Sequence, residues 1–535
     1  MAKEILFDTA MRDKLVSGIE TVATAVASTL GPSGRTVLIE QEFGSTLITK
    51  DGVSVAKSIE LEDRVENVGA GLIKNIASKT NDQAGDGTTT STVLAAEMVK
   101  EGIKSVRVGV NPIYIKKGID KAVEDTIKLL SEDAKPITTK EEIAQVASIS
   151  ANDDTALGNI IADAIEKVGN NGVITVEESQ TIDTYVTYVE GMQFDRGYIS
   201  PIFCNDRENF RVEYSNPYIL LYDGSISSND DIFPILEAAN RKQKPLLIIA
   251  DDITDAALTT LVMNSARGVI QVCAVKSPGF GDRRKDLMQD LAVLTGAHFI
   301  SPSAGDSLGR ATLEDLGTCD NIKVTSKSTT IVGGGGAEGA VEERINYLQR
   351  LISATASSYD REKLQERLAK LAGGIAVLSV GATTEIELKE KKHRVEDAVN
   401  ATRASIEEGV VAGGGTELCQ ISAALAKKSK QFDCEDEKIG YNIVVKALEK
   451  PIKQIAENAG MDGVVVADRC KRSKKGTGFD ALHNTWCDMM KAGIVDPMRV
   501  TKSALTNAAS IVALVLTSSA VVTTIADDTS DQMTR

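Results

Sequence analysis

Hydrophobic residues at helical spacing dominate the first and last parts of the chain. In the first part, four apolar residues are separated by four, three and four positions, which places them on one face of a helix. They are Leu15, Ile19, Val22 and Val26. This helix is expected to stop at Leu30, because Gly31-Pro32 follows it. Ala-rich amphipathic patterns predict further helices over residues 67–78, 89–101, 452–459 and 503–516.

A different pattern lies between the helix expected to stop at Leu30 and the helix predicted over residues 67–78. Two short strand-like runs, 36–39 and 46–49, are separated by a polar link that contains Gly44, and the second run ends before Asp51-Gly52. Short β-branched runs joined by a polar, glycine-containing link are typical of a hairpin. We therefore expect a small β-hairpin in this otherwise helical part.

The middle of the chain alternates apolar strand-like runs with helical segments. The runs cover residues 173–176, 246–249, 270–275 and 375–380. Such alternation predicts an α/β region with parallel pairing. The order helical, α/β, helical indicates that the two outer parts form one discontinuous domain and that the middle part is inserted into it.

Several glycines lie near the boundaries between the helical and the α/β parts of the chain, namely Gly191, Gly373, Gly374 and Gly409. Each could be a hinge, because glycine tolerates large changes in φ and ψ, or an ordinary turn residue. The polar segment 526–535 at the end of the sequence is expected to be disordered.

Charge and composition narrow the classes of function. The formal net charge of the 535 residues is −16, which argues against nucleic acid as the main partner, because its phosphates need Lys and Arg. Seven cysteines without a CxxC spacing and three scattered histidines favour reduced thiols over a disulfide framework or a His-based metal cluster. We find no run of 18 apolar residues and no signal-peptide pattern at the N-terminus, so we expect no membrane contact. The expected location is the cytoplasm, unless the chain is the mature form of an imported protein.

Three loops carry residues suited to binding a nucleotide. They are residues 30–35, 49–52 and 85–90. In the third, glycines free backbone N–H groups, threonines cap the next helix, and Asp86 offers a hard oxygen to Mg²⁺. A capped helix start without a ligand explains this loop equally well when it is taken alone. Asp397 gains significance only if it converges with Asp51 and Asp86.

Two well-known nucleotide-binding sequence patterns do not describe this chain well. The chain has no GxxxxGK[ST] sequence, so an ATP site here would not be a P-loop. Gly334, Gly336 and Gly339 satisfy GxGxxG after the strand-like run 329–332. The segment after them, 357–367, is predicted to be a charged helix rather than a second strand, which favours a flexible loop over a dinucleotide site.

Seven segments, in order along nearly the whole chain, resemble the group I chaperonins, the GroEL/Hsp60 family. They are Thr29–Pro32, Thr49–Gly52, Ala84–Thr90, Glu190–Tyr198, Pro278–Arg284, Tyr359–Arg367 and Glu407–Gly415. The resemblance implies a multidomain α and α/β fold: a discontinuous, mostly helical equatorial ATPase domain, a small intermediate hinge domain, and an α/β apical domain inserted in the middle. The implied boundaries are 1–132 and 410–535 (equatorial), 133–189 and 376–409 (intermediate) and 190–375 (apical).

The resemblance also implies an ATP/ADP site with Mg²⁺ and K⁺. Asp86 would bind Mg²⁺, Asp51 and Asp397 would position and activate the hydrolytic water, and backbone oxygens near Thr29 and Lys50 would hold K⁺. The expected nucleotide contacts are Thr29, Leu30, Gly31, Pro32, Lys50, Asp86, Gly87, Thr88, Thr89, Thr90, Gly414, Asp480, Ala481, Leu482 and Asp496. Asp480 begins the segment that corresponds to the family's Asn-Ala-Ala, so the contact with the base differs there.

The partners implied are unfolded polypeptides, further copies of the chain in a seven-membered ring, and a co-chaperonin of the GroES/Hsp10 type. Clients and the co-chaperonin would bind an apolar apical surface, and Arg196 and Glu385 would form a switchable salt bridge between subunits. The implied surface comprises Tyr198, Ile202, Phe203, Phe233, Leu236, Leu258, Val262 and Met263. The spacing of Phe233 and Leu236, and of Leu258 and Val262, taken alone favours core positions.

Two departures from the family bear on assembly. The polar end of the sequence stands where family members commonly have a Gly-Met-rich tail. Lys453 and Asp462 stand at the ring-to-ring positions usually filled by Arg and Glu, which keeps the charges but not their reach. One ring or two therefore both stay open.

The function that the resemblance implies is an ATP-dependent folding chaperonin that encloses and releases clients. Two other hypotheses are a dinucleotide-dependent enzyme using Gly334–Gly339 and a scaffold that binds unfolded chains without hydrolysis.

Overall fold

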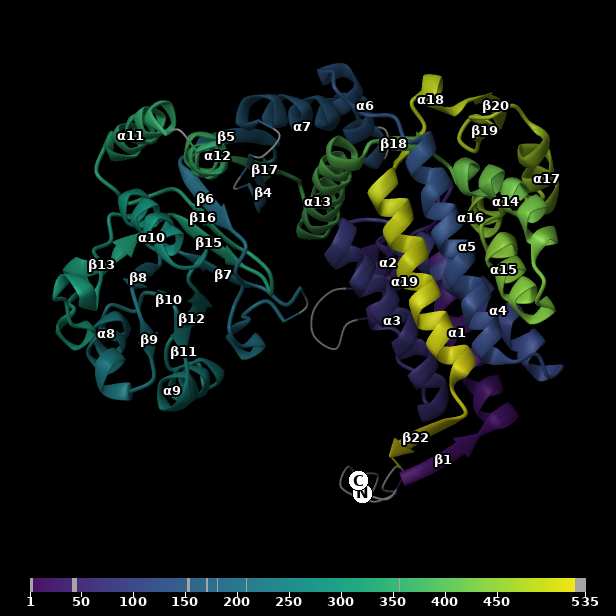
Figure 1. The fold of residues 1–535 in the computed structure, drawn as a ribbon, viewed down its shortest axis with the longest axis horizontal. Helices are drawn as coiled ribbons and strands as arrows, with labels where there is room; N and C mark the ends of the chain where they lie inside the picture. The colour runs from purple at the N-terminus through teal and green to yellow at the C-terminus, as the bar shows by residue number, and fades with distance from the viewer. Residues whose placement is uncertain are drawn as a thin grey trace. The chain divides into compact units, whose positions relative to one another are not determined.

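The computed structural model describes residues 3–40, 46–151, 154–169, 172–179, 181–207, 209–355 and 357–524. Gly44 and the segment 526–535 lie outside these residues. The chain divides into two compact units (Figure 1). Unit 1 comprises Met1–Asp163, Glu178–Asp183 and Val380–Arg535, and unit 2 comprises Ala164–Glu177 and Thr184–Ser379.

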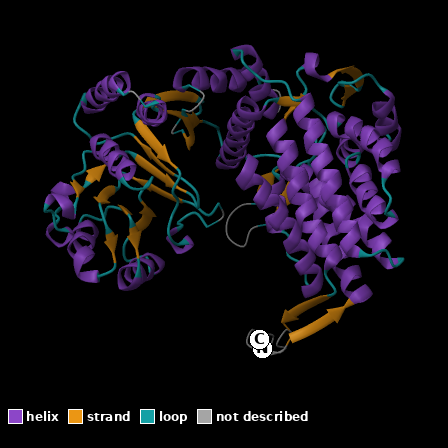
Figure 2. Ribbon diagram, in the orientation of Figure 1, coloured by secondary structure: helices purple, strands orange, loops and turns teal. Residues whose placement is uncertain are grey.

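Unit 1 is a helical bundle built mainly from the first and last parts of the chain. Its long helices run side by side (Figure 2). The helices are α1 (Asp8–Ala27), α2 (Gly52–Ser58), α3 (Arg64–Ala84), α4 (Thr88–Arg107), α5 (Pro112–Asp133), α6 (Lys140–Ser150), α13 (Glu385–Glu408), α14 (Thr416–Lys428), α15 (Glu435–Ala447), α16 (Lys450–Asn458), α17 (Gly463–Arg472), α18 (Met489–Ala492) and α19 (Met498–Thr517). Helix α7 (Thr155–Val168) continues into unit 2.

Two glycines let α5 and α15 approach each other closely. A Cβ on Gly118 would lie 2.0 Å from the carbonyl oxygen of Glu437, and one on Gly440 would lie 2.1 Å from that of Ile115. Side chains at these positions would force the helices apart, so both glycines are required by packing.

Helix α19 is long and apolar enough by composition to cross a membrane, with a mean hydropathy of 1.4. It packs against α3, α4 and α5, and most of its apolar face lies inside unit 1. Burial of this kind is typical of the central helix of a bundle.

Small antiparallel sheets complete unit 1. They pair β1 (Lys3–Phe7) with β22 (Ala520–Thr524), β2 (Val37–Ile39) with β3 (Leu47–Thr49), β18 (Val410–Ala412) with β21 (Val495–Pro497), and β19 (Thr477–Asp480) with β20 (Thr485–Asp488). The β2–β3 pair confirms the predicted hairpin. The β1–β22 pair joins segments near the two ends of the sequence (Figure 1).

Unit 2 is built on a parallel sheet whose strands are buried on both faces. The sheet has the order β12 (Val272–Lys276), β10 (Leu246–Ala250), β8 (Tyr218–Tyr222), β13 (Phe299–Ile300), and β14 (Gly317–Thr318) pairs antiparallel with β8. All five residues of β10 are buried. Continuous apolar strands of this type are typical of parallel sheets. The predicted parallel pairing is confirmed for the runs 246–249 and 270–275, whereas the run 375–380 pairs antiparallel with residues 185–189.

The remaining elements of unit 2 form two further sheets and the helices around them. The sheets are β6 (Gly191–Phe194), β16 (Thr329–Val332), β15 (Asn321–Val324), β7 (Val212–Ser215), and β4 (Val173–Glu178), β17 (Ile375–Val380), β5 (Tyr185–Val189), with the two-residue strands β9 (Ser225–Ile226) and β11 (Asp252–Ile253) paired separately. The helices are α8 (Asn229–Arg241), α9 (Asp255–Ala266), α10 (Asp282–Thr295), α11 (Ala340–Ala354) and α12 (Ser358–Ala372), with 3₁₀ turns at Pro201–Phe203, Pro302–Ala304, Leu308–Arg310 and Leu313–Asp315.

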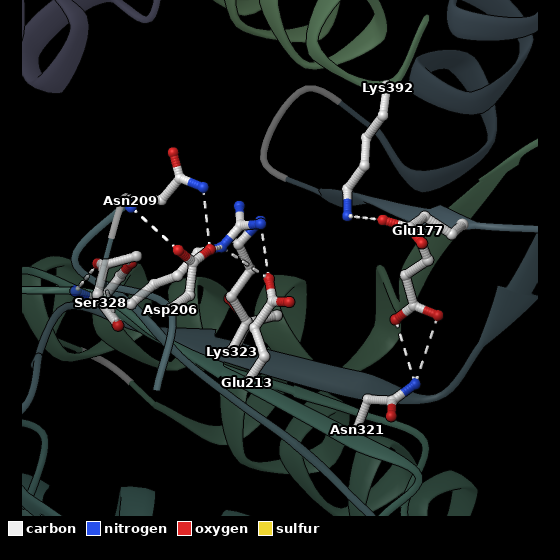
Figure 3. Close-up of polar contacts among 12 residues, drawn as sticks. Glu177, Asp206, Asn209, Glu213, Asn321, Lys323, Ser328 and Lys392 are labelled. Carbon is white, nitrogen blue, oxygen red and sulfur yellow. Dashed lines mark hydrogen bonds and ion pairs between the residues drawn. The ribbon is translucent and has the colours of Figure 1, made fainter. Parts of the chain in front are cut away.

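A polar network covers the β7–β15 edge of unit 2 (Figure 3). Arg211 Nε lies 2.7 Å from Asp206 and 3.0 Å from Glu213, and Lys323 Nζ lies 3.8 Å from Glu213. Asn321 on β15 donates to Glu177 at 3.2 Å. Each acid here has a basic or amide partner, as exposed structural networks commonly do.

The GxGxxG segment is a packing element. A Cβ on Gly334 would lie 2.1 Å from the carbonyl oxygen of Leu294, and one on Gly336 would lie 2.2 Å from that of Val293, so the loop packs tightly on α10 rather than lying loose. Strand β16 before it pairs antiparallel with both β15 and β6. A dinucleotide fingerprint requires a parallel βαβ unit, so this architecture argues against that hypothesis.

Two of the four glycines proposed as hinges require glycine for backbone reasons. Gly374 has φ 59° and Gly409 has φ 80°. A Cβ on Gly409 would also lie 2.6 Å from the carbonyl oxygen of Lys135, where residues 135 and 410 form an antiparallel bridge. A separate hinge domain over 133–189 and 376–409 stays a prediction.

Candidate functional site

The loop after α1 is held by the side chain of Asn458 on α16. Asn458 Nδ2 donates to the carbonyl oxygens of Ala27 at 3.0 Å and Leu30 at 2.8 Å. Gly31 turns the chain with φ 84° against the side chain of Ile455. Thr29 Oγ1 lies 3.5 Å from Thr89 Oγ1, so this loop meets the start of α4.

The second loop places Asp51 at the start of α2. Its carboxylate caps the helix by accepting from the backbone N–H groups of Val53 at 3.1 Å and Ser54 at 2.8 Å. A Cβ on Gly52 would lie 2.4 Å from Thr89 Oγ1. The second loop therefore lies directly against the third, while Lys50 next to it is exposed.

The third loop is shaped by two glycines with positive φ. Gly85 ends α3 with φ 70°, and Gly87 precedes α4 with φ 81°. The helix begins at Thr88, so the free N–H groups of its first turn and its positive dipole end are at this loop. Asp86, between the glycines, accepts from the N–H of Gly87. A Cβ on Gly85 would lie 2.3 Å from Asn400 on α13, so the loop also contacts the helix that carries Asp397.

Four aspartates from different parts of the chain converge at this place. Burial raises the pKa of Asp397 well above its ordinary value, and the negative charges of Asp86, Asp51 and Glu396 raise it further. Burial and Asp51 raise the pKa of Asp86, against a hydrogen bond from the N–H of Gly87. Burial is the main cause of these shifts, and the smaller effect of like charge shows that the carboxylates lie within electrostatic reach of one another.

Asp496 is the fourth member of this group. Burial and the charge of Asp86 raise its pKa to about 7, although it accepts from the N–H of Gly415. The pairing of Val411 with Asp496 between β18 and β21 places it beside the loop 413–415, where Gly414 has φ 63°. The four aspartates, all only half buried, lie among dense protein atoms but still reach solvent.

The segment predicted to contact the base forms a tight turn after β19. Asp480 accepts from the backbone N–H groups of Leu482 at 3.0 Å and His483 at 3.2 Å, and from the His483 ring at 2.8 Å. Burial opposes ionisation of Asp480, yet these bonds lower its pKa. Gly478 of β19 lies against Thr416 at the start of α14, which keeps this turn next to the loop 413–415.

This arrangement suits a cation bound together with phosphates. The structure brings together the three predicted loops, Asp397, the loop 413–415 and Asp496. In the described part of the chain no three His, Cys, Asp or Glu side chains form a metal site by themselves. Mg²⁺ is commonly held by one or two carboxylates plus phosphate oxygens, and a helix N-terminus favours phosphate, so the residues fit Mg²⁺ with a nucleotide.

Sequence reasoning missed two residues that shape the site. Asn458 holds the first loop, and nothing in its local sequence indicates this. Glu417, in the first turn of α14, is buried, and burial together with a hydrogen bond shared with Asp133 raises its pKa to about 7. A glutamate directly after Gly-Gly-Gly-Thr was the available signal for it.

The residues predicted to bind clients differ in exposure. Ile202, Phe233 and Met263 are 52%, 59% and 45% exposed, whereas Phe203 is 1% exposed and Leu236 is 7% exposed. Tyr198, Leu258 and Val262 are partly buried against the core of unit 2. Phe203 and Leu236 are therefore core residues in this conformation, and Ile202, Phe233 and Met263 form the accessible part of the predicted surface.

Residues predicted to act between subunits have partners within the chain. Arg196 stacks over Phe280 at 5.0 Å, and Glu385 pairs with Lys389 at 3.0 Å. Lys453 pairs with Glu449 at 2.7 Å, and Asp462 caps α17 through the N–H groups of Val464 and Val465. Their roles between subunits stay predictions.

Comparison with known families gives a match over most of the chain. The model of the TCP-1/cpn60 chaperonin family matches residues 22–526, which include every element of the candidate site.

Proposed function

This chain belongs to the TCP-1/cpn60 chaperonin family, and from that premise we propose that it is a group I chaperonin subunit that couples Mg-ATP hydrolysis to folding of non-native proteins. Members of this family are ATPases that assist protein folding. The observation that carries the proposal is the convergence of Asp51, Asp86, Asp397 and Asp496 at the N-terminus of α4.

Each residue has a distinct proposed role. Asp86 and phosphate oxygens would hold Mg²⁺, which would neutralise charge on the transferred phosphoryl group. Asp397 would orient and activate the hydrolytic water, because desolvation and neighbouring acids make it a stronger base than an ordinary aspartate. Asp51, fixed as the cap of α2, would position that water. The amides and hydroxyls of Thr88, Thr89 and Thr90 would bind phosphate.

The finer assignments complete the proposal. Backbone oxygens near Thr29 and Lys50 would bind K⁺, and the turn at Asp480–Leu482 together with Asp496 would contact the nucleoside. Seven copies would form a ring, in a bacterial-type cytoplasm, with Ile202, Phe233 and Met263 available to clients and to a GroES/Hsp10-type co-chaperonin. An exposed apolar patch of this kind suits non-specific binding of unfolded chains.

Electron microscopy and an ATPase assay on the purified protein test the proposal together. Sevenfold rings and Mg²⁺-dependent release of phosphate are expected. Particles without rings would contradict the assembly, and rings that do not hydrolyse ATP would instead favour a scaffold that binds unfolded chains without catalysis.

A further inference from the structure

Two fully buried thiols lie at the crossing of α14 and α17. Cys419 on α14 and Cys470 on α17 are both 0% exposed. Cys419 Sγ lies 3.5 Å from the carbonyl oxygen of Ala467 on α17, and Cys470 Sγ lies 3.9 Å from that of Thr416 on α14. Each thiol therefore reaches the turn that precedes the other cysteine on the facing helix. This reciprocal contact places both thiols at the same helix crossing, each facing the helix that carries the other.

The thiols belong to the packing that supports the candidate nucleotide site. Their apolar cluster contains Phe479 and Ala481 and packs against Leu30. Helix α14 begins directly after the loop 413–415, and α17 packs on β19, which leads into Asp480. A covalent bond between the two helices would fix the phosphate side of the site to the base side.

We propose that Cys419 and Cys470 form a reversible disulfide under hydroperoxide, and that this bond regulates the nucleotide site. The thiolate of one cysteine attacks the peroxide oxygen, which gives a sulfenic acid and releases water or an alcohol. The second thiol then attacks that sulfur, the S–S bond forms, and a second water leaves. The peroxide is reduced and the two thiols are oxidised, so the balance is closed. A dithiol restores both cysteines by exchange.

Burial sets the conditions under which this reaction proceeds. The neighbouring thiol and burial raise the pKa of Cys419, so little thiolate exists while the helices are closed. Reaction then requires local opening of α17 from α14. The pair stays reduced under ordinary conditions and oxidises only under sustained peroxide.

Peptide mapping tests the bond without reference to ATP. The reduced, full-length protein is treated with hydrogen peroxide, alkylated in denaturant, digested without reductant and analysed by mass spectrometry. We expect a peptide linking Cys419 to Cys470 that dithiothreitol removes, with Cys419→Ala and Cys470→Ala as negative variants and Cys434→Ala as the matched control that retains it. Both thiols remaining alkylatable after the half-buried Cys434 is fully oxidised would overturn the proposal.

Two readouts test the regulatory part. Closing a loop of about 50 residues should raise the thermal midpoint of unit 1 by about 5 °C in the oxidised protein and leave both alanine variants unchanged. This step rests on the proposed ATPase: turnover should fall by about threefold on oxidation and recover with dithiothreitol, because the site can no longer adjust between states. A mapped bond with unaltered turnover would overturn the regulation. Absence of hydrolysis in the reduced protein would instead contradict the proposed function and leave the disulfide standing.

Discussion

Two groups of acids, one in each unit, are treated in opposite ways. In unit 2, Asp290 is fully buried and is bound by Arg344 Nε at 2.7 Å and Arg367 Nε at 2.9 Å. Asp223, after strand β8, behaves alike: burial opposes its charge, but hydrogen bonds from Ser301 and Arg284 lower its pKa. In unit 1, by contrast, burial and the negative charge of neighbouring acids raise the pKa values of Asp86, Asp397 and Asp496.

The difference separates structural acids from functional ones. A buried acid paired with arginine is neutralised within the fold, and the pair ties helices α10, α11 and α12 together. Facing acids store repulsion, which a bound cation relieves. A protein that keeps such repulsion does so at a site that binds or reacts. The contrast therefore separates the site acids of unit 1 from the arginine-paired acids of unit 2.

The largest effect is expected from Asp397→Ala. Loss of a residue that activates water should lower the rate of ATP hydrolysis by about 10³-fold. Phosphate release by intact rings measures this, with Glu408→Gln on the same helix as a matched control, since Glu408 is paired with Lys502. Equal turnover in wild type and Asp397→Ala would show that the repulsion serves some purpose other than catalysis.

Asp397→Ala in unit 1 and Arg367→Ala in unit 2 should change the free energy of unfolding in opposite directions. Asp397→Ala removes a carboxylate whose ionisation is disfavoured in the fold. At pH values above neutral it should therefore give a small stabilisation of the protein. Arg367→Ala leaves Asp290 buried with fewer partners and should lower the free energy of unfolding of unit 2 by about 3 kcal/mol.

Denaturant unfolding measures both changes. Arg350→Ala, an exposed arginine on α11, is the matched control for Arg367→Ala. A destabilising Asp397→Ala together with a neutral Arg367→Ala would reverse the comparison between the units.

Glu417 provides a pH-dependent test within unit 1. Its pKa is about 7, above the ordinary 4.5, and it faces Asp133 of α5, Lys475 and the backbone at Ala412. An acid whose pKa is raised by folding favours the folded state fully below about pH 4.5 and loses that contribution as the pH rises through 7. Glu417→Gln cannot ionise, so it should be more stable than wild type by about 3 kcal/mol at pH 8.5 and by about 1 kcal/mol at pH 5.5.

Urea unfolding at these two pH values measures the difference. Glu435→Gln, an exposed acid of α15, should show no such change between them. A gap between Glu417→Gln and wild type that is constant with pH would mean that Glu417 does not change its protonation on folding.

The smallest effect is expected at the surface of unit 2. Phe233→Ser removes an exposed ring from α8 and should weaken binding of an unfolded client by about 1 kcal/mol, roughly fivefold, without changing ATP turnover. Fluorescence titration with a denatured protein measures the affinity. Tyr347→Ser, an exposed aromatic on α11 outside the predicted surface, is the control. If both substitutions weaken binding equally, the client surface is wider than Ile202, Phe233 and Met263.

The sequence allowed much of the fold to be predicted, because periodicity reports burial directly. The stripe Leu15–Val26, the apolar run of β10 and the hairpin before Asp51 all occur as expected. Motifs also indicated the three loops, but their convergence could not be read from spacing. It depends on the packing of α13 on the loop at Gly85 and on the pairing of β18 with β21.

Other features could not have been predicted from the sequence, and the reasons are physical. The exposure of Phe233 and the burial of Leu236 follow from how α8 packs, since both residues are apolar and three positions apart. Cys419 and Cys470 are 51 positions apart along the chain, and only the packing of α14 on α17 brings each to the helix of the other. Asn458 holds the first loop by donating to a backbone carbonyl oxygen. Every residue has such a carbonyl, so the identity of the residue that accepts does not reveal the contact.

The most direct test of the central claim is recovery of a chemically denatured client enzyme in the presence of this protein. With Mg-ATP, and with the co-chaperonin where the rings require it, wild type should restore client activity well above the spontaneous level. Asp397→Ala should bind the client but should not go through repeated cycles of ATP hydrolysis and release. Recovery that is the same with and without ATP, or the same for wild type and Asp397→Ala, would contradict an ATP-driven folding cycle built on the facing aspartates of unit 1.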